Sequence, residues 1–109
     1  MDNADTILDL GLGDSHARQT DIMSLTTETW YHVALTWDGG NYVVYVNGQE
    51  KANGSYTGLD TLNPVADIGN DGNTDAGGRT EAFNGLLDDV RIYNVALTGA
   101  EISYLAGAN

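Results

Sequence analysis

The sequence contains no cysteine, which excludes both a disulfide framework and a zinc site built on thiolates. It has one proline and 14 glycines, a balance that indicates tight turns between short strands. Basic side chains are also scarce: 4 lysines and arginines stand against 16 aspartates and glutamates, for a net charge of −12. Such a surface repels phosphate backbones and anionic lipid, which argues against nucleic-acid and membrane-surface roles. The acidity fits cation binding, a salty environment or plain solubility.

Long apolar runs are absent too. No stretch approaches the roughly 18 apolar residues that a membrane span requires, so we expect no membrane insertion. The first residues, MDNADTILDLGLG, are acidic and lack the basic segment and apolar run of a signal peptide. A chain of 109 residues is long enough for one modest core, and we expect a single domain over residues 1–109.

What is present is a succession of short segments with the alternation of a half-buried strand. The clearest is WYHVALTWD, in which Val33, Leu35 and Trp37 fall on one face. The residues 38–41, Asp-Gly-Gly-Asn, predict a tight turn after it, and Asn47-Gly48 predicts a type I′ hairpin turn at the end of NYVVYV.

Other segments have a weaker strand pattern. TILDLGLG, DIMSL and PVADIG read as strands, and the polar EKANGSYTG reads as an exposed edge strand. Residues 70–80 carry no large apolar side chain and predict a long surface loop, after which residues 81–97 regain strand character. Thr98 and Glu101 form a capping box and predict a helical turn. These elements predict an all-β antiparallel sandwich that ends in a short C-terminal helical turn.

Three stretches in the same order carry a family resemblance: WYHVALTWDGGNYVVYVNGQE from Trp30, Ile68-Gly69, and FNGLLDDVRIYNVALTGAEI from Phe83. Over about two thirds of the chain they resemble the laminin G-like, concanavalin A-like lectin-glucanase jelly rolls. Such domains usually place several strands before the Trp-x-His-Val segment, whereas here only residues 1–29 precede it. An uncovered sheet edge or core face would follow, and we therefore expect self-association.

Asp88 is the main candidate for a metal ligand. It alternates with Val90 and Ile92, which predicts an inward carboxylate, and such a group is costly unless it is paired or bound to metal. The resemblance implies a structural Ca²⁺ held by this aspartate and backbone carbonyls, in keeping with an oxygen-only ligand set. The alternative is that Asp88 accepts hydrogen bonds from backbone amides at a turn. Asp89 then faces outward as a surface charge.

A second candidate metal site lies in the 70–80 loop. Asp71, Asn73 and Asp75 have the spacing of the first ligands of an EF-hand loop, but Ala76 and Ala82 replace its glycine and its final glutamate. These replacements argue against an EF-hand. A looser Ca²⁺ site made of side-chain and carbonyl oxygens is one reading of this loop, and a turn rich in Gly, Asn and Asp is the other.

Aromatic residues are the candidates for carbohydrate contacts, because their rings can stack on sugars. Trp30 and Trp37 are predicted to lie in the core, whereas Tyr42 and Tyr56, beside turns or on the polar hairpin, are predicted to be exposed platforms. Arg79 in the long loop is a further candidate ligand contact. We find no histidine–nucleophile pair and no strand of paired carboxylates, so an enzyme is not expected.

The resemblance implies a non-catalytic carbohydrate-binding, lectin-like module of an extracellular bacterial protein, supported by calcium. A structural or protein-adhesion module without a sugar site is the alternative, and a degenerate glycoside hydrolase or lyase is the third. The expected partner is accordingly a glycan or an extracellular protein, and the expected location is outside the cell or on its surface.

Overall fold

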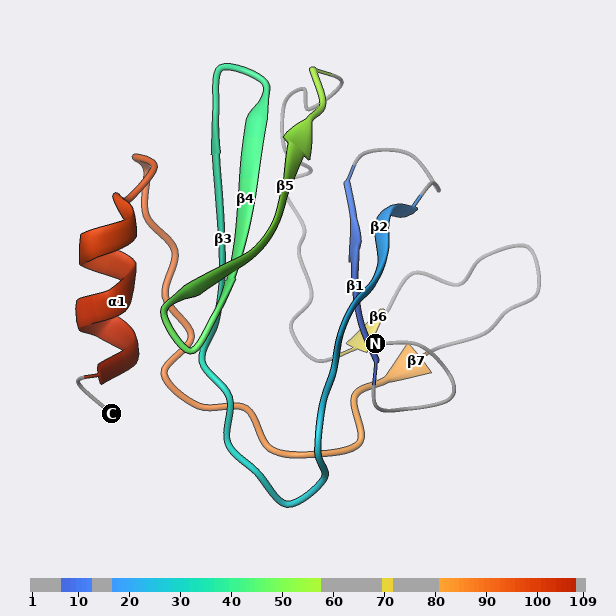
Figure 1. Ribbon diagram of the computed structural model, residues 1–109. Helices are drawn as coiled ribbons and strands as arrows, with labels where there is room; N and C mark the ends of the chain where they lie inside the picture. The colour runs from blue at the N-terminus through green and yellow to red at the C-terminus, as the bar shows by residue number, and fades with distance from the viewer. Residues whose placement is uncertain (1–6, 13–16, 58–69, 72–80, 108–109) are drawn as a thin grey trace. The chain divides into compact units, whose positions relative to one another are not determined.

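The computed structural model describes residues 7–12, 17–57, 70–71 and 81–107. Its elements, drawn in Figure 1, are strands β1 (Ile7–Gly11), β2 (Ala17–Ser24), β3 (Val33–Asp38), β4 (Asn41–Val46), β5 (Gln49–Ser55), β6 (Asn70–Asp71) and β7 (Glu81–Ala82), and helix α1 (Gly99–Gly107). The fold is the predicted all-β antiparallel sandwich with a short C-terminal helix. The chain forms two compact units, residues 1–60 with 93–109, and residues 61–92.

Two tight turns create the meander β3-β4-β5 at the centre of the first unit (Figure 1). Asp38 pairs with Asn41, and the two residues between them, Gly39 and Gly40, have φ of 57° and 91°. Val46 pairs with Gln49, and the intervening Asn47 and Gly48 have φ of 52° and 80°. Positive φ at both central residues is the mark of a type I′ turn, whose twist matches that of the strands. The predicted hairpins are confirmed.

The core of this unit is built on one face of β4. Tyr42, Val44 and Val46 are buried at every second position, with Val46 only 1% exposed. The hairpin β1-β2 contributes Gln19, whose Nε2 donates hydrogen bonds to the hydroxyl of Tyr42 at 3.0 Å and to the carbonyl of Asn53 at 3.1 Å. This one amide therefore ties β2 to both β4 and β5, and it brings the two sheets of the unit together.

Helix α1 begins where the sequence predicts. Thr98 Oγ1 accepts from the N–H of Glu101 at 3.2 Å, and Glu101 Oε1 accepts from the N–H of Thr98 at 3.0 Å, which is a complete capping box. The helix buries Ile102 and lies against the β4-β5 turn, where a Cβ on Gly48 would stand 3.1 Å from the Cα of Ser103. Nine residues are too few to cross a bilayer, and within the described residues no helix is long and apolar enough to do so.

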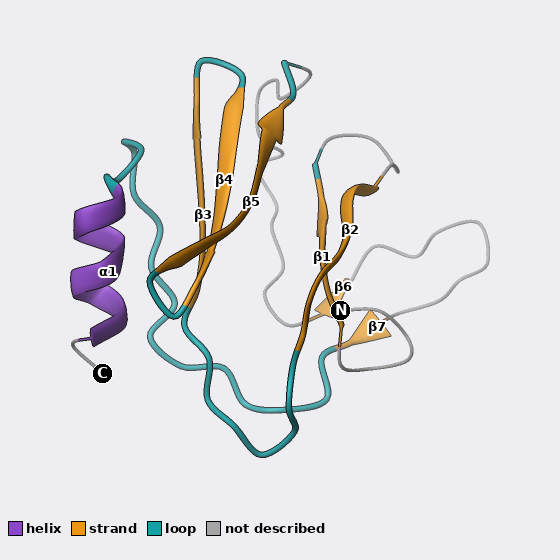
Figure 2. Cartoon of the chain, viewed as in Figure 1, coloured by secondary structure: helices purple, strands orange, loops and turns teal. Residues whose placement is uncertain are grey.

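The strand predicted around Val90 and Ile92 is wrong. Within residues 83–98 the structure contains no strand, and Figure 2 draws this stretch as loop. Asp89 has a left-handed backbone with φ of 53°, which interrupts the extended conformation that a strand needs. Leu86, Val90 and Ile92 are exposed. The alternation of apolar and polar residues in this stretch does not produce a strand, because none of the described strands pairs with it.

The predicted core tryptophans are also wrong, because Trp30 is 64% exposed and Trp37 is 45% exposed. Trp37 lies on the same sheet face as buried Tyr42, its cross-strand partner. However, β3 stands at the end of its sheet, so the side chains on it have a neighbouring strand on one side only. PVADIG lies outside the described residues, whereas TILDLGLG and DIMSL form parts of β1 and β2.

Candidate functional site

An apolar groove lies along one side of α1 in the first unit. Its lining residues are Ala100, Glu101, Tyr104 and Leu105 of the helix, with Tyr93 and Leu97 of the segment that leads into the helix. The groove is open to solvent and has a volume of about 340 Å³. The spacing of the helical residues places them on one face, because side chains three and four positions apart are neighbours on a helix. Ile102, on the opposite face, is buried.

Two tyrosines give this groove its chemistry. Tyr104 is 76% exposed and Tyr93 is 44% exposed, so both side chains can be reached by a ligand. An exposed aromatic ring presents a flat apolar face, and its hydroxyl both donates and accepts hydrogen bonds. The groove can therefore accept a small ligand that is apolar on its faces and polar at its edges.

Glu101 contributes a fixed negative charge. Its Oε1 accepts hydrogen bonds from the backbone N–H and from the hydroxyl of Thr98, each at 3.0 Å. These bonds, the backbone one first, hold the pKa of Glu101 below its usual range. A carboxylate that is both ionised and positioned can accept hydrogen bonds from a hydroxylated ligand, and it disfavours an anionic one.

The structure describes two of the three predicted ligand residues. Tyr42 is 5% exposed and its hydroxyl is bonded to Gln19, so it is a core residue and the prediction of an exposed platform is wrong. A ring that packs against a glycine explains this: a Cβ on Gly54, opposite Tyr42 in β5, would collide with the tyrosine. Tyr56 is half-buried at the end of β5. Arg79 lies outside the described residues.

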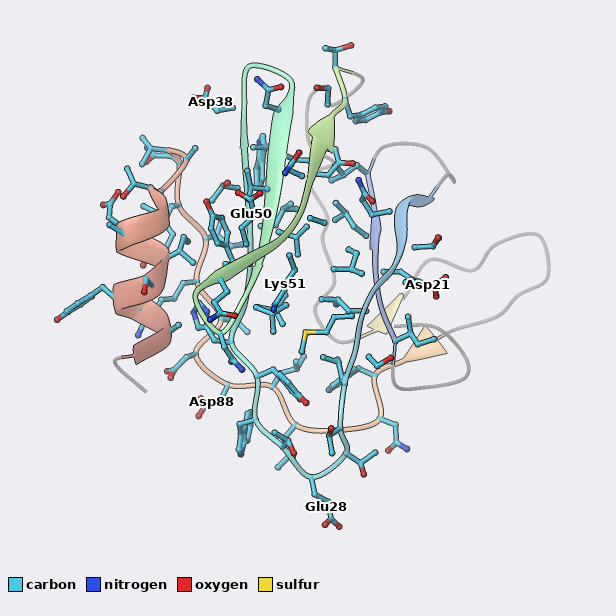
Figure 3. All side chains as sticks on the ribbon, viewed as in Figure 1. Asp21, Glu28, Asp38, Glu50, Lys51 and Asp88 are labelled. Atoms are coloured by element: carbon cyan, nitrogen blue, oxygen red, sulfur yellow. The ribbon has the colours of Figure 1, made fainter. Side chains whose placement is uncertain are left out.

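The predicted inward carboxylate of Asp88 is wrong as well. Asp88 is exposed, and Figure 3 labels it on the segment that precedes the helix. Its Oδ1 accepts from the N–H of Asp89 at 2.8 Å. The alternative prediction, a side chain that accepts from a backbone amide at a turn, agrees with this bond and with the left-handed φ of Asp89.

The other predicted calcium ligands lie at the margin of what the structure describes. Asp71 belongs to β6, which pairs with β7, and Asn73 and Asp75 lie outside the described residues. Among the described side chains, no three from histidine, cysteine, aspartate and glutamate are grouped so that they could hold a metal ion. The calcium site in residues 70–80 stays a prediction.

Sequence reasoning missed Tyr93 and Tyr104 as site residues, although a signal for Tyr104 was present. Ile102 and Tyr104 are two positions apart in a helix whose start is marked by a capping box, and such residues point to opposite sides. Only one of them can face the core. No comparable local signal marks Tyr93, because its exposure depends on how the loop segment meets the helix.

Comparison with known proteins identifies relatives of the chain. The sequence model described as the concanavalin A-like lectin/glucanases superfamily matches residues 3–103. Among solved structures, the chain is similar to an S-layer domain-containing protein from Clostridium thermocellum, of which residues 221–444 were crystallised. The two are 29% identical with a TM-score of 0.65, and the match covers 77% of this chain and 42% of that one. The chain thus spans less than half the length of this relative.

Proposed function

Since the chain belongs to the concanavalin A-like lectin/glucanases superfamily, we propose that it is a non-catalytic carbohydrate-binding module of an extracellular bacterial protein. The observation that carries the proposal is the groove that Tyr93, Glu101 and Tyr104 help to line. The resemblance to an S-layer domain-containing protein of a bacterium supports a surface location.

The chemistry of the groove suits a neutral sugar. One face of a pyranose ring is a patch of C–H groups that stacks on an aromatic ring, and its hydroxyls donate to carboxylates and phenols at the rim. Glu101 is ionised, and the whole chain carries a net charge of −12. Uronic or sialic acids would meet repulsion from both, so the ligand class is a neutral glycan rather than an acidic one.

Calcium support is the second part of this proposal. It rests on the acidic composition and on the oxygen-rich 70–80 segment with Asp71, Asn73 and Asp75. Asp88 is the remaining proposed contributor, through the carboxylate oxygen that does not accept from Asp89. A calcium ion here would stabilise loops and would take no part in chemistry, because its ligands are hard oxygens and no reaction is proposed.

A structural or protein-adhesion module is the second candidate. It is favoured by the apolar side chains that the chain leaves exposed, among them Leu86, Leu87, Val90 and Ile92. Contiguous exposed apolar residues are typical of surfaces that bind protein, whereas sugar sites surround an aromatic ring with polar groups. The groove and these residues therefore point to different partners.

A screen against neutral and acidic glycans, with calcium and with chelator, tests the proposal. We expect binding to a neutral glycan that Tyr104→Ala abolishes and Tyr104→Phe retains, because the phenylalanine keeps the stacking face. Trp30→Ala is the matched control, since it removes an exposed aromatic ring outside the groove. If binding is lost in chelator, the proposed role of calcium is supported. If binding persists in chelator, calcium is not required and that part of the proposal is wrong. If the folded protein binds no glycan in the screen, the sugar site is overturned and a structural or protein-adhesion module is favoured.

A further inference from the structure

The sheet β3-β4-β5 has two end strands that differ in how they are protected. β5 carries the adjacent charges Glu50 and Lys51, both labelled in Figure 3, and its pairing with β4 is shifted between Val44 and Tyr45. Charges and register irregularities are the usual means by which edge strands avoid pairing with other chains. β3 has neither: its register with β4 is unbroken over six pairs, and its one charged residue is the terminal Asp38.

The backbone of β3 offers hydrogen bonds on its outer side. The N–H of Asn47 donates to the carbonyl of His32 at 2.7 Å, so His32 turns its backbone groups toward β4. Because these directions alternate along an antiparallel strand, Val33, Leu35 and Trp37 turn theirs away from β4. Among the described strands, none pairs with that side of β3. The same three residues carry the apolar side chains of the strand, with Val33 and Trp37 exposed and Leu35 half-buried.

We propose that two copies of the chain associate through β3, edge to edge and antiparallel, with Leu35 on the two-fold axis. Leu35 then faces Leu35 of the second copy, and Val33 faces Trp37 in both directions. All three residues with outward backbone groups are hydrogen-bonded in this register. It also places the large side chain of Trp37 opposite the smaller side chain of Val33. The contact is isologous, as in most dimers, because both copies use the same residues. This proposal is independent of the glycan site, which lies along α1.

The pairing of polar side chains selects the register. With Leu35 on the axis, Asp38 of one copy is opposite His32 of the other, so at each end of the pair the strand's one carboxylate faces a side chain that can donate a hydrogen bond. The next permitted register, with Thr36 on the axis, would place Val33 against the Gly39 turn and Asp38 against Ala34. That arrangement leaves Val33 uncovered and the carboxylate without a partner, so it is the weaker one.

Single cysteines test the register, since the chain has no other cysteine. Leu35→Cys places two sulfurs across the axis, where Cα atoms of a hydrogen-bonded pair stand about 5.5 Å apart and can be bridged. Thr36→Cys is the control. In the proposed register residue 36 of one copy is a diagonal neighbour of residue 36 of the other, and such positions stand about 7–8 Å apart, which is too far for a disulfide. We expect a reducible dimer for Leu35→Cys only. A dimer for Thr36→Cys alone would overturn the proposed register.

A non-covalent measurement keeps the proposal testable if Leu35→Cys fails to fold. In sedimentation velocity we expect the unmodified protein to dimerise, and more strongly as salt rises, because salt screens the repulsion between two chains of net charge −12. Val33→Glu on exposed β3 should weaken the dimer at least tenfold, whereas Gln49→Glu adds the same charge to β5 and should leave it within about twofold. A monomer at all salt concentrations, or equal effects of the two variants, would overturn the proposal.

Discussion

Strand β4 and the segment 83–92 are both rich in apolar residues, yet β4 is a partly buried strand and the segment is an exposed loop. β4 reads NYVVYV and buries Tyr42, Val44 and Val46 at alternate positions. The segment reads FNGLLDDVRI, and every side chain in it is exposed. Both sequences contain a run that alternates in the manner of a strand. Apolar content and periodicity therefore do not distinguish the two.

The difference lies in where each segment finds its pairing partners. β4 has a two-residue type I′ turn at each end, so both neighbouring strands are supplied by adjacent sequence. Residues 83–92 have no such turn, and a strand there would need a partner from far along the chain or outside it. Closing a long loop costs more conformational entropy than closing a tight turn. An apolar segment becomes a strand when it is given a neighbour.

The largest expected contrast comes from the same deletion in both regions. Val46→Ala removes two methyl groups from a side chain that is 1% exposed, and we expect the free energy of unfolding to fall by about 2.5 kcal/mol. Val90→Ala makes the same change on an exposed side chain and should stay within about 0.5 kcal/mol. Urea unfolding followed by tryptophan fluorescence measures both. Equal losses would mean that residues 83–92 are packed in solution.

The next largest loss of stability is expected from a substitution in the turn after β4. Gly48→Ala places a Cβ 3.1 Å from the Cα of Ser103 and forces a φ of 80° on an L-residue, so we expect a loss of about 2 kcal/mol. Gly11→Ala in β1 is the matched control, because its Cβ would meet no atom within 4 Å. The midpoints of thermal unfolding compare them. A neutral Gly48→Ala would show that the turn and the helix do not constrain β4.

A smaller loss is expected from the hydrogen bond that ties the sheets together. Tyr42→Phe keeps the buried ring but leaves the Gln19 amide without its tyrosine acceptor, and we expect a loss of about 1 kcal/mol. Tyr104→Phe removes an exposed hydroxyl and should be neutral. Denaturant titrations at one temperature distinguish the two variants. A neutral Tyr42→Phe would indicate that water or Asn53 alone satisfies the amide.

The smallest expected effect concerns the helix cap and depends on pH. Thr98→Ala removes the hydroxyl that bonds Glu101 and should cost about 0.5–1 kcal/mol at pH 7, whereas Thr98→Ser should be nearly neutral. Because the Thr98 bonds lower the pKa of Glu101, their contribution is present above the ordinary glutamate pKa and is lost as pH falls through the lowered value. Thr98→Ala removes the hydroxyl bond to the carboxylate but keeps the backbone bond, and it also removes the bond from the Glu101 N–H, which does not depend on pH. The stability difference between Thr98→Ala and the unmodified protein should therefore narrow from pH 7 to pH 3 without vanishing.

The features that the sequence predicted correctly are those that depend on neighbouring residues. The Asn47-Gly48 turn and the Thr98–Glu101 capping box need only a few residues each, and both are present in the structure. The errors share a different cause. The exposure of Trp37 and the burial of Tyr42 depend on which strand or hairpin covers a sheet face, and adjacent sequence does not encode that. The groove at Tyr93 and Tyr104 was missed for the same reason.

The bond between Gln19 and Asn53 joins residues 34 positions apart, whereas the two turns of the meander join strands through two residues each. Hairpins form in microseconds, and contacts that are distant in sequence form later. During synthesis β1 and β2 leave the ribosome first, but the amide of Gln19 has no acceptor in β5 until Asn53 has emerged. The strands that are made first thus wait for β5 before they can make this contact.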